Sequence, residues 1–120
     1  MRSFLERLLF QYISYNEDRT PVFGRRIQTA FIYTMNVPED AISEIGYDKK
    51  FKAYTALLER ILGPSKAFIS SETLQVNDYS NYNMTMFDEN ERKLRRKTVF
   101  PLDCQNAFAL GAEMVNAVGY

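Results

Sequence analysis

The sequence lacks histidine altogether and carries a single cysteine, Cys104. Without an imidazole, the chain alone has no hydrolase triad, no histidine-ligated metal and no imidazole proton shuttle. One thiol excludes an internal disulfide, an iron–sulfur cluster held by the chain's own thiolates and a multi-cysteine zinc site. We therefore expect no metal site.

Glycine and net charge are also scarce. The five glycines are scattered and form no phosphate-cradling cluster, and Lys plus Arg equals Asp plus Glu at 15 each, for a net charge of zero. No summed field favours nucleic acid or an anionic membrane. No apolar run reaches about 18 residues, and Glu6 and Arg7 interrupt the N-terminal apolar pattern, unlike a signal-peptide core. We expect a cytoplasmic protein without nucleic-acid or membrane partners.

The 120 residues, 46% of them apolar, fit one domain with a real core over residues 1–120. Ser3 and Glu6 have the spacing of a capping box, so the sequence predicts a one-faced helix over residues 3–14. The apolar positions that recur at helical spacing are Phe4, Leu5, Leu8, Leu9, Tyr12 and Ile13.

The stretch TAFIYT, residues 29–34, predicts a short strand. It lacks period-two alternation, which favours a strand covered on both faces as in a parallel sheet; a buried helical segment is the alternative. The strand breaks into a polar loop at Thr34, Met35 and Asn36, and strand ends of this kind bind ligands in open α/β proteins. Pro38 opens the next segment.

The rest of the chain continues the alternation. A helix is predicted to end at Gly63 and Pro64, and a strand over residues 66–70 runs on through Val76 into a tyrosine-rich loop. Asp88 is placed to cap a charged helix through Lys97. The helix that ends at Gly63 is expected to line one face with Phe51, Tyr54, Leu58, Ile61 and Leu62. A final helix from Pro101 has the apolar positions Cys104, Ala107, Phe108, Gly111, Met114, Val115 and Val118.

The order helix, strand, helix, strand, helix implies βαβ connections and a parallel sheet, so the fold class is α/β. Only two strands are visible, and a parallel pair flanked by three helices leaves one strand edge unpaired. We expect oligomerisation to complete this two-strand unit.

Several phrases together resemble the C-terminal half of the flavodoxin-like NAD(P)H-dependent FMN reductase family, the group of multimeric flavodoxins and iron–sulfur flavoproteins. These phrases are ERLLF-x-YISYN, TAFIYTMNVPE, EIGYDK, ETLQVNDYSNY, MFDENERK-x-RR and FP-x-DC-x-x-AF-x-LGA. The resemblance implies a partial flavodoxin-like three-layer αβα sandwich. Residues 3–14, 27–34, 48–62, 66–76 and 101–118 then match the family's third helix, fourth strand, fourth helix, fifth strand and fifth helix.

The resemblance also implies a cofactor. In the family, FMN binds with its phosphate in a glycine- and serine-rich loop after the first strand, which would lie before Met1 here. The loop after the fourth strand lies beside the flavin ring, and Thr34, Met35, Asn36 and Val37 occupy the matching place. For the isolated chain we favour the simpler interpretation, that Thr34 and Asn36 satisfy backbone groups at a strand end. We expect no FMN to bind to this chain alone.

Other conspicuous residues each admit two interpretations. The basic run over residues 92–97 suits a phosphate of NADPH or nucleic acid, but a solvated helical face paired with the preceding acidic residues is favoured. Tyr79 and Tyr82 could stack on a flavin or a base, but we favour the interpretation that they pack at a subunit contact. Cys104 lies near the start of the last predicted helix, where a thiol could be reactive, but we favour the interpretation that it is buried and inert. Glu72 has no recognisable catalytic partner and receives no role.

Three functions remain open: half of a flavin-dependent oxidoreductase domain, a truncated relative without catalysis, and a partner-binding module that uses its free strand edge. We expect a two-fold homodimer, because the edge of residues 29–34 carries no guarding charge. Two copies would pair these edges antiparallel. The alternative dimer packs the helical faces around Phe4, Leu8 and Tyr12 against each other.

Overall fold

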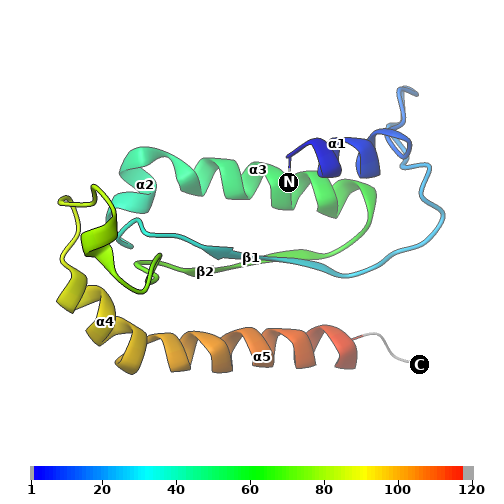
Figure 1. The fold of residues 1–120 in the computed structure, drawn as a ribbon. Coiled ribbons are helices and arrows are strands. Elements are labelled where there is room, and N and C mark those ends of the chain that lie inside the picture. Colours follow the sequence, from blue (N-terminus) through cyan, green and yellow to red (C-terminus); the bar gives the residue numbers. More distant parts are fainter. Residues whose placement is uncertain (1, 118–120) are drawn as a thin grey trace. The chain divides into compact units, whose positions relative to one another are not determined.

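A computed structural model describes residues 2–117 (Figure 1). The predicted final helix therefore extends past the described residues at Val118. Within residues 2–117 the structure contains five α-helices, a 3₁₀ turn and two strands. In chain order these are α1 (Arg2–Phe10), β1 (Thr29–Thr34), α2 (Ala41–Ile45), α3 (Tyr47–Ile61), β2 (Ser65–Ser70), η1 (Tyr79–Asn81), α4 (Glu89–Thr98) and α5 (Phe100–Asn116).

The two strands form a parallel pair, as the sequence predicted. Three backbone hydrogen bonds establish the direction: Ile27 N donates to Leu62 O, Thr29 N to Pro64 O and Met35 N to Ser70 O. Donor and acceptor advance together along both strands, which is the pattern of parallel rather than antiparallel pairing. The α/β class is therefore confirmed, and β1 has the predicted bounds.

The chain divides into two compact units, and each strand contributes residues to both. The first unit comprises residues up to Phe31 together with Asp48–Ala67, and the second comprises Ile32–Tyr47 together with the chain from Phe68. The core of the first unit consists of Leu9 from α1 and Leu58, Ile61 and Leu62 at the end of α3. The predicted apolar face of α3 is confirmed, because Phe51 is also buried and Tyr54 packs its ring 6.2 Å from that of Phe31.

Helix α1 is shorter than predicted. It begins before Ser3 and ends at Phe10, and Glu6 accepts a hydrogen bond from Arg2 Nε at 3.0 Å. The predicted capping box is therefore wrong, since Ser3 lies inside the helix. After Phe10 the chain turns, and Tyr12 and Ile13 reach the core from this turn, with the Tyr12 ring 4.8 Å from Phe23. The helical spacing of Tyr12 and Ile13 in the sequence therefore reflects their packing against the core, which they reach from a turn and not from a helix.

Helix α3 ends where the sequence predicted. Leu62 N and Gly63 N both donate to Leu58 O, at 2.7 and 3.3 Å, and Gly63 has φ +134°. A Cβ at Gly63 would lie 2.7 Å from Ile27 O, so the residue must be glycine for the two segments to approach this closely. The separate helix α2 was not predicted; it ends at Gly46, which has φ +85°.

Two strand predictions are wrong in part. Strand β2 ends at Ser70 instead of continuing to Val76, because Glu72 adopts a left-handed φ of +52° that no strand accommodates. Strand β1 is not covered on both faces along its whole length, since Ile32 is 55% exposed.

The second unit contains α2, η1, α4 and α5. Asp88 caps α4 as predicted, with Oδ1 accepting from Asn90 N at 2.7 Å and from Glu91 N at 3.1 Å. Helix α5 starts one residue before Pro101, so the proline sits in the first turn, where no N–H is needed. Across residues 2–117, no helix has both the length and the apolar character needed to cross a membrane.

Candidate functional site

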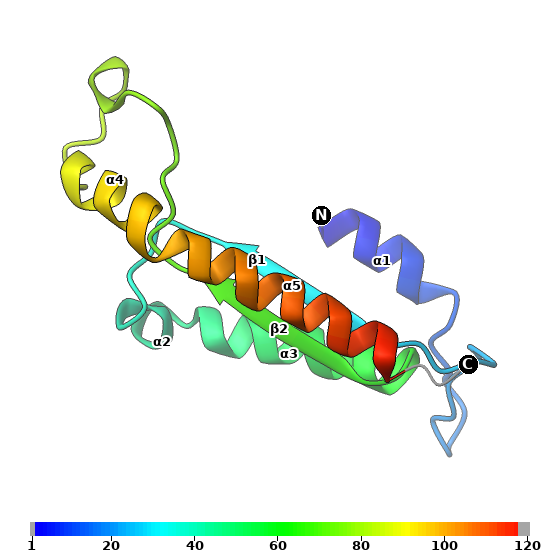
Figure 2. The ribbon, with the colours of Figure 1, turned by 90° about the horizontal axis from the view of Figure 1, so that it is seen from below.

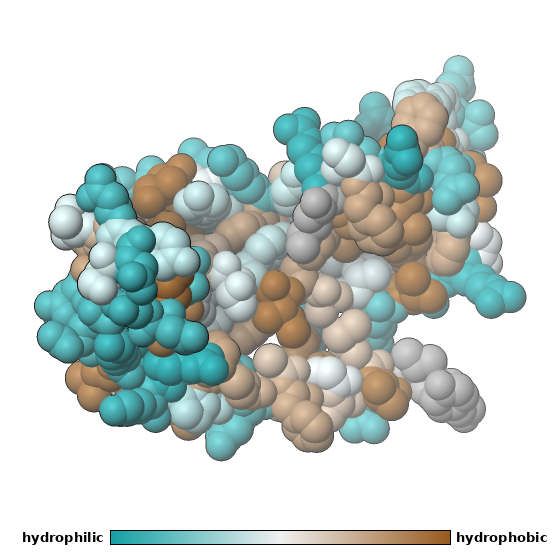
Figure 3. Space-filling view, in the orientation of Figure 1, coloured by the Kyte–Doolittle hydropathy of each residue, from teal (hydrophilic) through white to brown (hydrophobic). Residues whose placement is uncertain are grey.

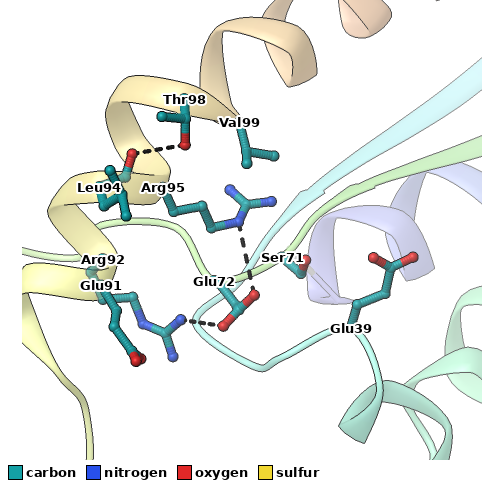
Figure 4. Close-up of a pocket in the computed structure, with 9 residues that line it drawn as sticks. All are labelled: Glu39, Ser71, Glu72, Glu91, Arg92, Leu94, Arg95, Thr98 and Val99. Carbon is teal, nitrogen blue, oxygen red and sulfur yellow. Dashed lines mark hydrogen bonds and ion pairs between the residues drawn. The ribbon is translucent and has the colours of Figure 1, made fainter.

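A cavity of about 470 Å³ lies in the second unit, beside the residues that follow β2 (Figure 4). Ser71 and Glu72 enter its wall directly after the strand, and α4 supplies most of the remaining wall. Open α/β sheets bind ligands outside the carboxyl ends of their strands, which makes this the candidate site. The lining residues are Glu39, Ser71, Glu72, Glu91, Arg92, Leu94, Arg95, Thr98 and Val99.

The centre of the site is an ion pair between Arg92 on α4 and Glu72. Arg92 Nη1 lies 2.6 Å from Glu72 Oε1, and Arg92 is only 6% exposed. Arg92 Nη2 also donates to Asn36 O at 3.3 Å, in the loop after β1. A single buried guanidinium therefore joins the chain segments that leave the two strands.

Arg95, one helical turn further along α4, extends the network to α5. Its Nη2 donates to Asp103 Oδ2 at 3.1 Å, and the same oxygen accepts from Ser70 Oγ at 2.6 Å. Arg95 Nε lies 4.0 Å from Glu72 Oε2. Two arginines thus meet two carboxylates, so their charges cancel within the network.

The loop predicted as the cofactor-binding segment, Thr34 to Val37, is held by its carbonyl groups. Met35 O accepts from Thr73 N at 2.9 Å and from Thr73 Oγ1 at 3.1 Å. Val37 O accepts from Glu72 N at 3.2 Å. With the Arg92 bond to Asn36 O, three consecutive carbonyls are occupied within the chain. These bonds fix the path of the loop backbone beside the network.

Three buried polar atoms in and beside this network have no hydrogen-bond partner in the described chain: Asn36 Oδ1, Arg92 Nε and Arg95 Nη1. Buried polar atoms are normally paired, so these offer one acceptor and two donors to a small polar group or water. Thr34 is exposed at the end of β1. Glu39 and Glu91 add negative charge at the cavity wall, which disfavours a strongly anionic ligand.

Comparison of the chain with protein-family models, with curated proteins and with solved structures finds no match. The FMN implied by the sequence resemblance fits these residues only in part. Asn36 Oδ1 is an unfilled acceptor at the predicted loop, but the described residues contain no glycine-rich turn that would present backbone N–H groups to a phosphate. Residues 2–117 contain no cluster of three or more metal-ligating side chains.

The favoured interpretation of the basic run holds for part of it. Lys93 is paired with Glu89 at 2.5 Å along α4, as expected for a solvated helical face. Arg92 and Arg95 are not solvated, because their side chains are 8% and 14% exposed and belong to the network. Arg96 stacks over the Phe100 ring at 3.9 Å.

Two other predictions are wrong, and one residue was missed. Tyr79 is buried at 6% exposure, with its hydroxyl near Gln75 N, so it is free for neither ring stacking nor a subunit contact; Tyr82 is 58% exposed. Cys104 is exposed rather than buried. Glu72, which received no role, is the centre of the network. The sequence feature that pointed to such a network was the spacing of Arg92 and Arg95, which puts two guanidinium groups on one face of a helix.

Proposed function

We propose that the chain is the carboxyl-terminal half of a flavodoxin-like NAD(P)H-dependent FMN reductase domain and does not bind FMN by itself. The observation that carries this proposal is the parallel pair β1–β2, which ends in the polar loop Thr34–Val37 beside a network of buried charges. This is the edge at which open α/β sheets hold their ligands. In a complete domain FMN would supply the hydride and electron chemistry.

The role of the chain's own residues is to position the loop Thr34–Val37. Arg92 fixes the loop through Asn36 O, and Thr73 fixes it through Met35 O. The Asn36 side-chain oxygen is buried and has no partner, so it is the acceptor of this loop that a ring N–H of the complete domain would satisfy. The network gives no net positive charge for a phosphate, so phosphate binding must come from residues outside this set.

The strand edges support a missing neighbour next to β1. In the described chain the sheet has two strands, so each strand keeps one free edge. Strand β2 carries Lys66, a charge of the kind that protects edge strands, whereas β1 carries none and exposes Ile32. We place the next strand of the complete sheet beside β1.

Titration of the purified chain with FMN and with riboflavin, followed by calorimetry and flavin fluorescence, tests this function. We expect no FMN binding at micromolar concentration and a colourless preparation, because the phosphate has no cradle. A yellow preparation with near-stoichiometric FMN would overturn the proposal of an incomplete site. In that case, loss of FMN binding in Asn36→Ala or Thr34→Ala would identify the side chain that binds the flavin.

A second candidate function, a partner-binding module, is favoured by the same bare edge of β1. In its homodimeric form, two copies pair residues 29–34 antiparallel about a two-fold axis. Ile32→Lys places a charge on this edge and should abolish the association seen by sedimentation velocity. Ile45→Lys is the matched control, because Ile45 is the same residue type with the same 55% exposure but lies in α2. Equal effects of the two variants would exclude strand pairing.

A further inference from the structure

The cavity beside α4 contains polar groups that the chain itself does not use. Ser71 is only 6% exposed, and its hydroxyl makes no hydrogen bond within residues 2–117. Arg92 and Arg95 line the same cavity, and Arg92 Nε and Arg95 Nη1 have no partner among the described residues. Buried polar groups are normally paired. The cavity wall therefore holds one hydroxyl and two nitrogen donors that a ligand oxygen would satisfy.

The charges around the cavity are of both signs. Two arginines and the carboxylates of Glu39, Glu72 and Glu91 line it, so its wall carries an excess of negative charge. Glu39 has no ion-pair partner in the part of the chain that the structure describes. An anion would use the donors but meet the excess negative charge, and a simple cation would leave the donors unpaired. A small zwitterion, with a carboxylate and an ammonium group, matches both.

Figure 4 shows how these groups are arranged. The Arg95 guanidinium lies on one side of the Ser71 hydroxyl and the Glu39 carboxylate on the other, while the Glu91 carboxylate points away from them. Donors for a carboxylate are thus gathered at one end of the cavity, and an unpaired carboxylate lies at the other. A zwitterion needs this separation of hydrogen-bond donors and negative charge within one cavity.

An apolar part of the wall completes the site. Leu94 on α4 and Val99, where α4 leads into α5 (Figure 2), line the cavity and are 62% and 39% exposed. The surface over α4 is otherwise mostly hydrophilic, as the teal side chains in Figure 3 show. The volume of about 470 Å³ is within the usual range for small-molecule sites, roughly 300–1,000 Å³. The two side chains offer an apolar contact to an aliphatic group of a ligand.

We propose that this cavity binds a free α-amino acid with an aliphatic side chain, such as leucine. Its carboxylate accepts hydrogen bonds from the Ser71 hydroxyl and from the Arg95 guanidinium, which turns slightly to bring Nη1 to the cavity surface. Its ammonium group pairs with Glu39, and its side chain packs against Leu94 and Val99. This site goes beyond the proposed function, which assigns the chain no small molecule that it binds alone.

The missing half of the proposed domain does not account for these unused groups. Its neighbouring strand is placed beside β1, whereas every lining residue except Glu39 follows β2. The lining residues also all belong to the second unit, so the cavity is formed by this chain without a further segment. We therefore expect the amino acid to bind to the chain as it stands.

Calorimetric titration of the purified chain with L-leucine tests the site. We expect saturable binding with a dissociation constant on the order of 1 mM or lower. Acetate and methylamine carry only one of the two charges, and glycine lacks the aliphatic group, so each should bind at least about tenfold more weakly. Absence of leucine binding at about 10 mM, or equal affinity for any of these three probes, would overturn the proposal. Titration with FMN remains the separate test of the proposed function.

A pair of glutamate variants identifies the partner of the ammonium group. Glu39→Gln removes a charge at an exposed position and should raise the dissociation constant of leucine at least about tenfold. Glu44→Gln is the matched control and should bind leucine like the wild type, because Glu44 is an exposed glutamate of α2 that does not line the cavity. Equal affinities of the two variants would overturn the proposal.

Ser71→Ala distinguishes a ligand contact from a structural role. Because the Ser71 hydroxyl has no partner in the described chain, its removal should not lower the urea midpoint of unfolding. The same variant should bind leucine several-fold more weakly, since the carboxylate loses a donor. A Ser71→Ala chain that binds leucine like the wild type would overturn the proposal, whatever its stability.

Discussion

Arg92 and Glu72 form an ion pair of unequal partners, with the Arg92 side chain 8% exposed and the Glu72 side chain 36% exposed at an N–O distance of 2.6 Å. Removing the carboxylate leaves a buried cation, whereas removing the cation leaves a carboxylate that water can reach. Glu72 also has a φ of +52°, which is unfavourable for a residue with a Cβ. Its position therefore combines a favourable ion pair with an unfavourable backbone.

Two substitutions at Glu72 separate these contributions. Glu72→Ala should lower the free energy of unfolding by about 2–3 kcal/mol, because Arg92 loses its charged partner. Glu72→Gly removes the same carboxylate but tolerates the left-handed backbone, so it should be about 1 kcal/mol more stable than Glu72→Ala. Urea unfolding followed by circular dichroism measures both values.

The control for these variants is Glu91→Ala, which removes an exposed carboxylate from the same cavity wall. It should change stability by no more than about 0.5 kcal/mol. If Glu91→Ala and Glu72→Ala lower the free energy of unfolding by the same amount, the ion pair between Glu72 and Arg92 does not stabilise the site.

The loop after β1 depends on the hydroxyl of Thr73. This hydroxyl donates to Met35 O at 3.1 Å and accepts from Gln75 Nε2 at 2.9 Å, in a residue 8% exposed. Thr73→Val keeps the shape and removes both hydrogen bonds of the hydroxyl, while Met35 O keeps its bond from Thr73 N and Gln75 Nε2 keeps its bond to Thr73 O, so it should cost about 1 kcal/mol. Thr73→Ser keeps the hydroxyl and should cost less. Faster amide hydrogen exchange around Met35 in Thr73→Val, and not in Thr73→Ser, would locate the effect in the loop; equal exchange would contradict it.

The features predicted correctly from sequence have local causes. Strand β1, the end of α3 at Gly63 and the Asp88 cap each follow from residues within a few positions of one another. The Glu72–Arg92 pair joins residues 20 apart, and the backbone conformation of Glu72 has no sequence signature. The spacing of Arg92 and Arg95 indicated two guanidinium groups on one helix face, but that Glu72 is their partner was visible only in three dimensions.

Helix α5 illustrates a different limit. Hydrophobic periodicity identifies which residues are apolar, but it does not tell which of them the rest of the chain covers. The pattern put Ala107 and Met114 together with Cys104 and Phe108 on one face, whereas the first two are half-buried and the last two are exposed. The prediction of a buried Cys104 failed for this reason.

The order of η1 should depend on pH through Asp78. Hydrogen bonds from the side chain and then the backbone N–H of Ser80 lower the pKa of Asp78 from its usual 3.8. Because the folded pKa is below the unfolded one, this carboxylate stabilises η1 above the unfolded pKa and ceases to do so as the pH falls through the folded pKa. Carboxyl ¹³C NMR should give a titration midpoint below 3.8 for Asp78. Ser80→Ala should move it upward; a midpoint that does not move would contradict the assigned cause.

Among the glycines that the structure describes, Gly63 should be the least tolerant of substitution by alanine. Its φ of +134° is rarely adopted by residues with a Cβ, and the added carbon would lie 2.7 Å from Ile27 O and 3.2 Å from Ile27 N. Relief requires moving the segment before β1, whose Ile27 N donates to Leu62 O at 2.8 Å. We expect Gly63→Ala to cost about 3 kcal/mol, from backbone strain together with loss of this contact.

Gly46→Ala is the matched control for Gly63, because Gly46 also has a positive φ, of +85°, but a Cβ there meets nothing within 4 Å. Gly46→Ala should lower the free energy of unfolding by about 1 kcal/mol, because only the unfavourable backbone conformation of alanine at positive φ contributes. Urea unfolding of the two variants under the same conditions gives the difference, which measures the close approach of Ile27 to the end of α3. Equal costs would mean that the segment before β1 yields freely, and the parallel pairing that begins at Ile27 would then contribute little to the first unit's stability.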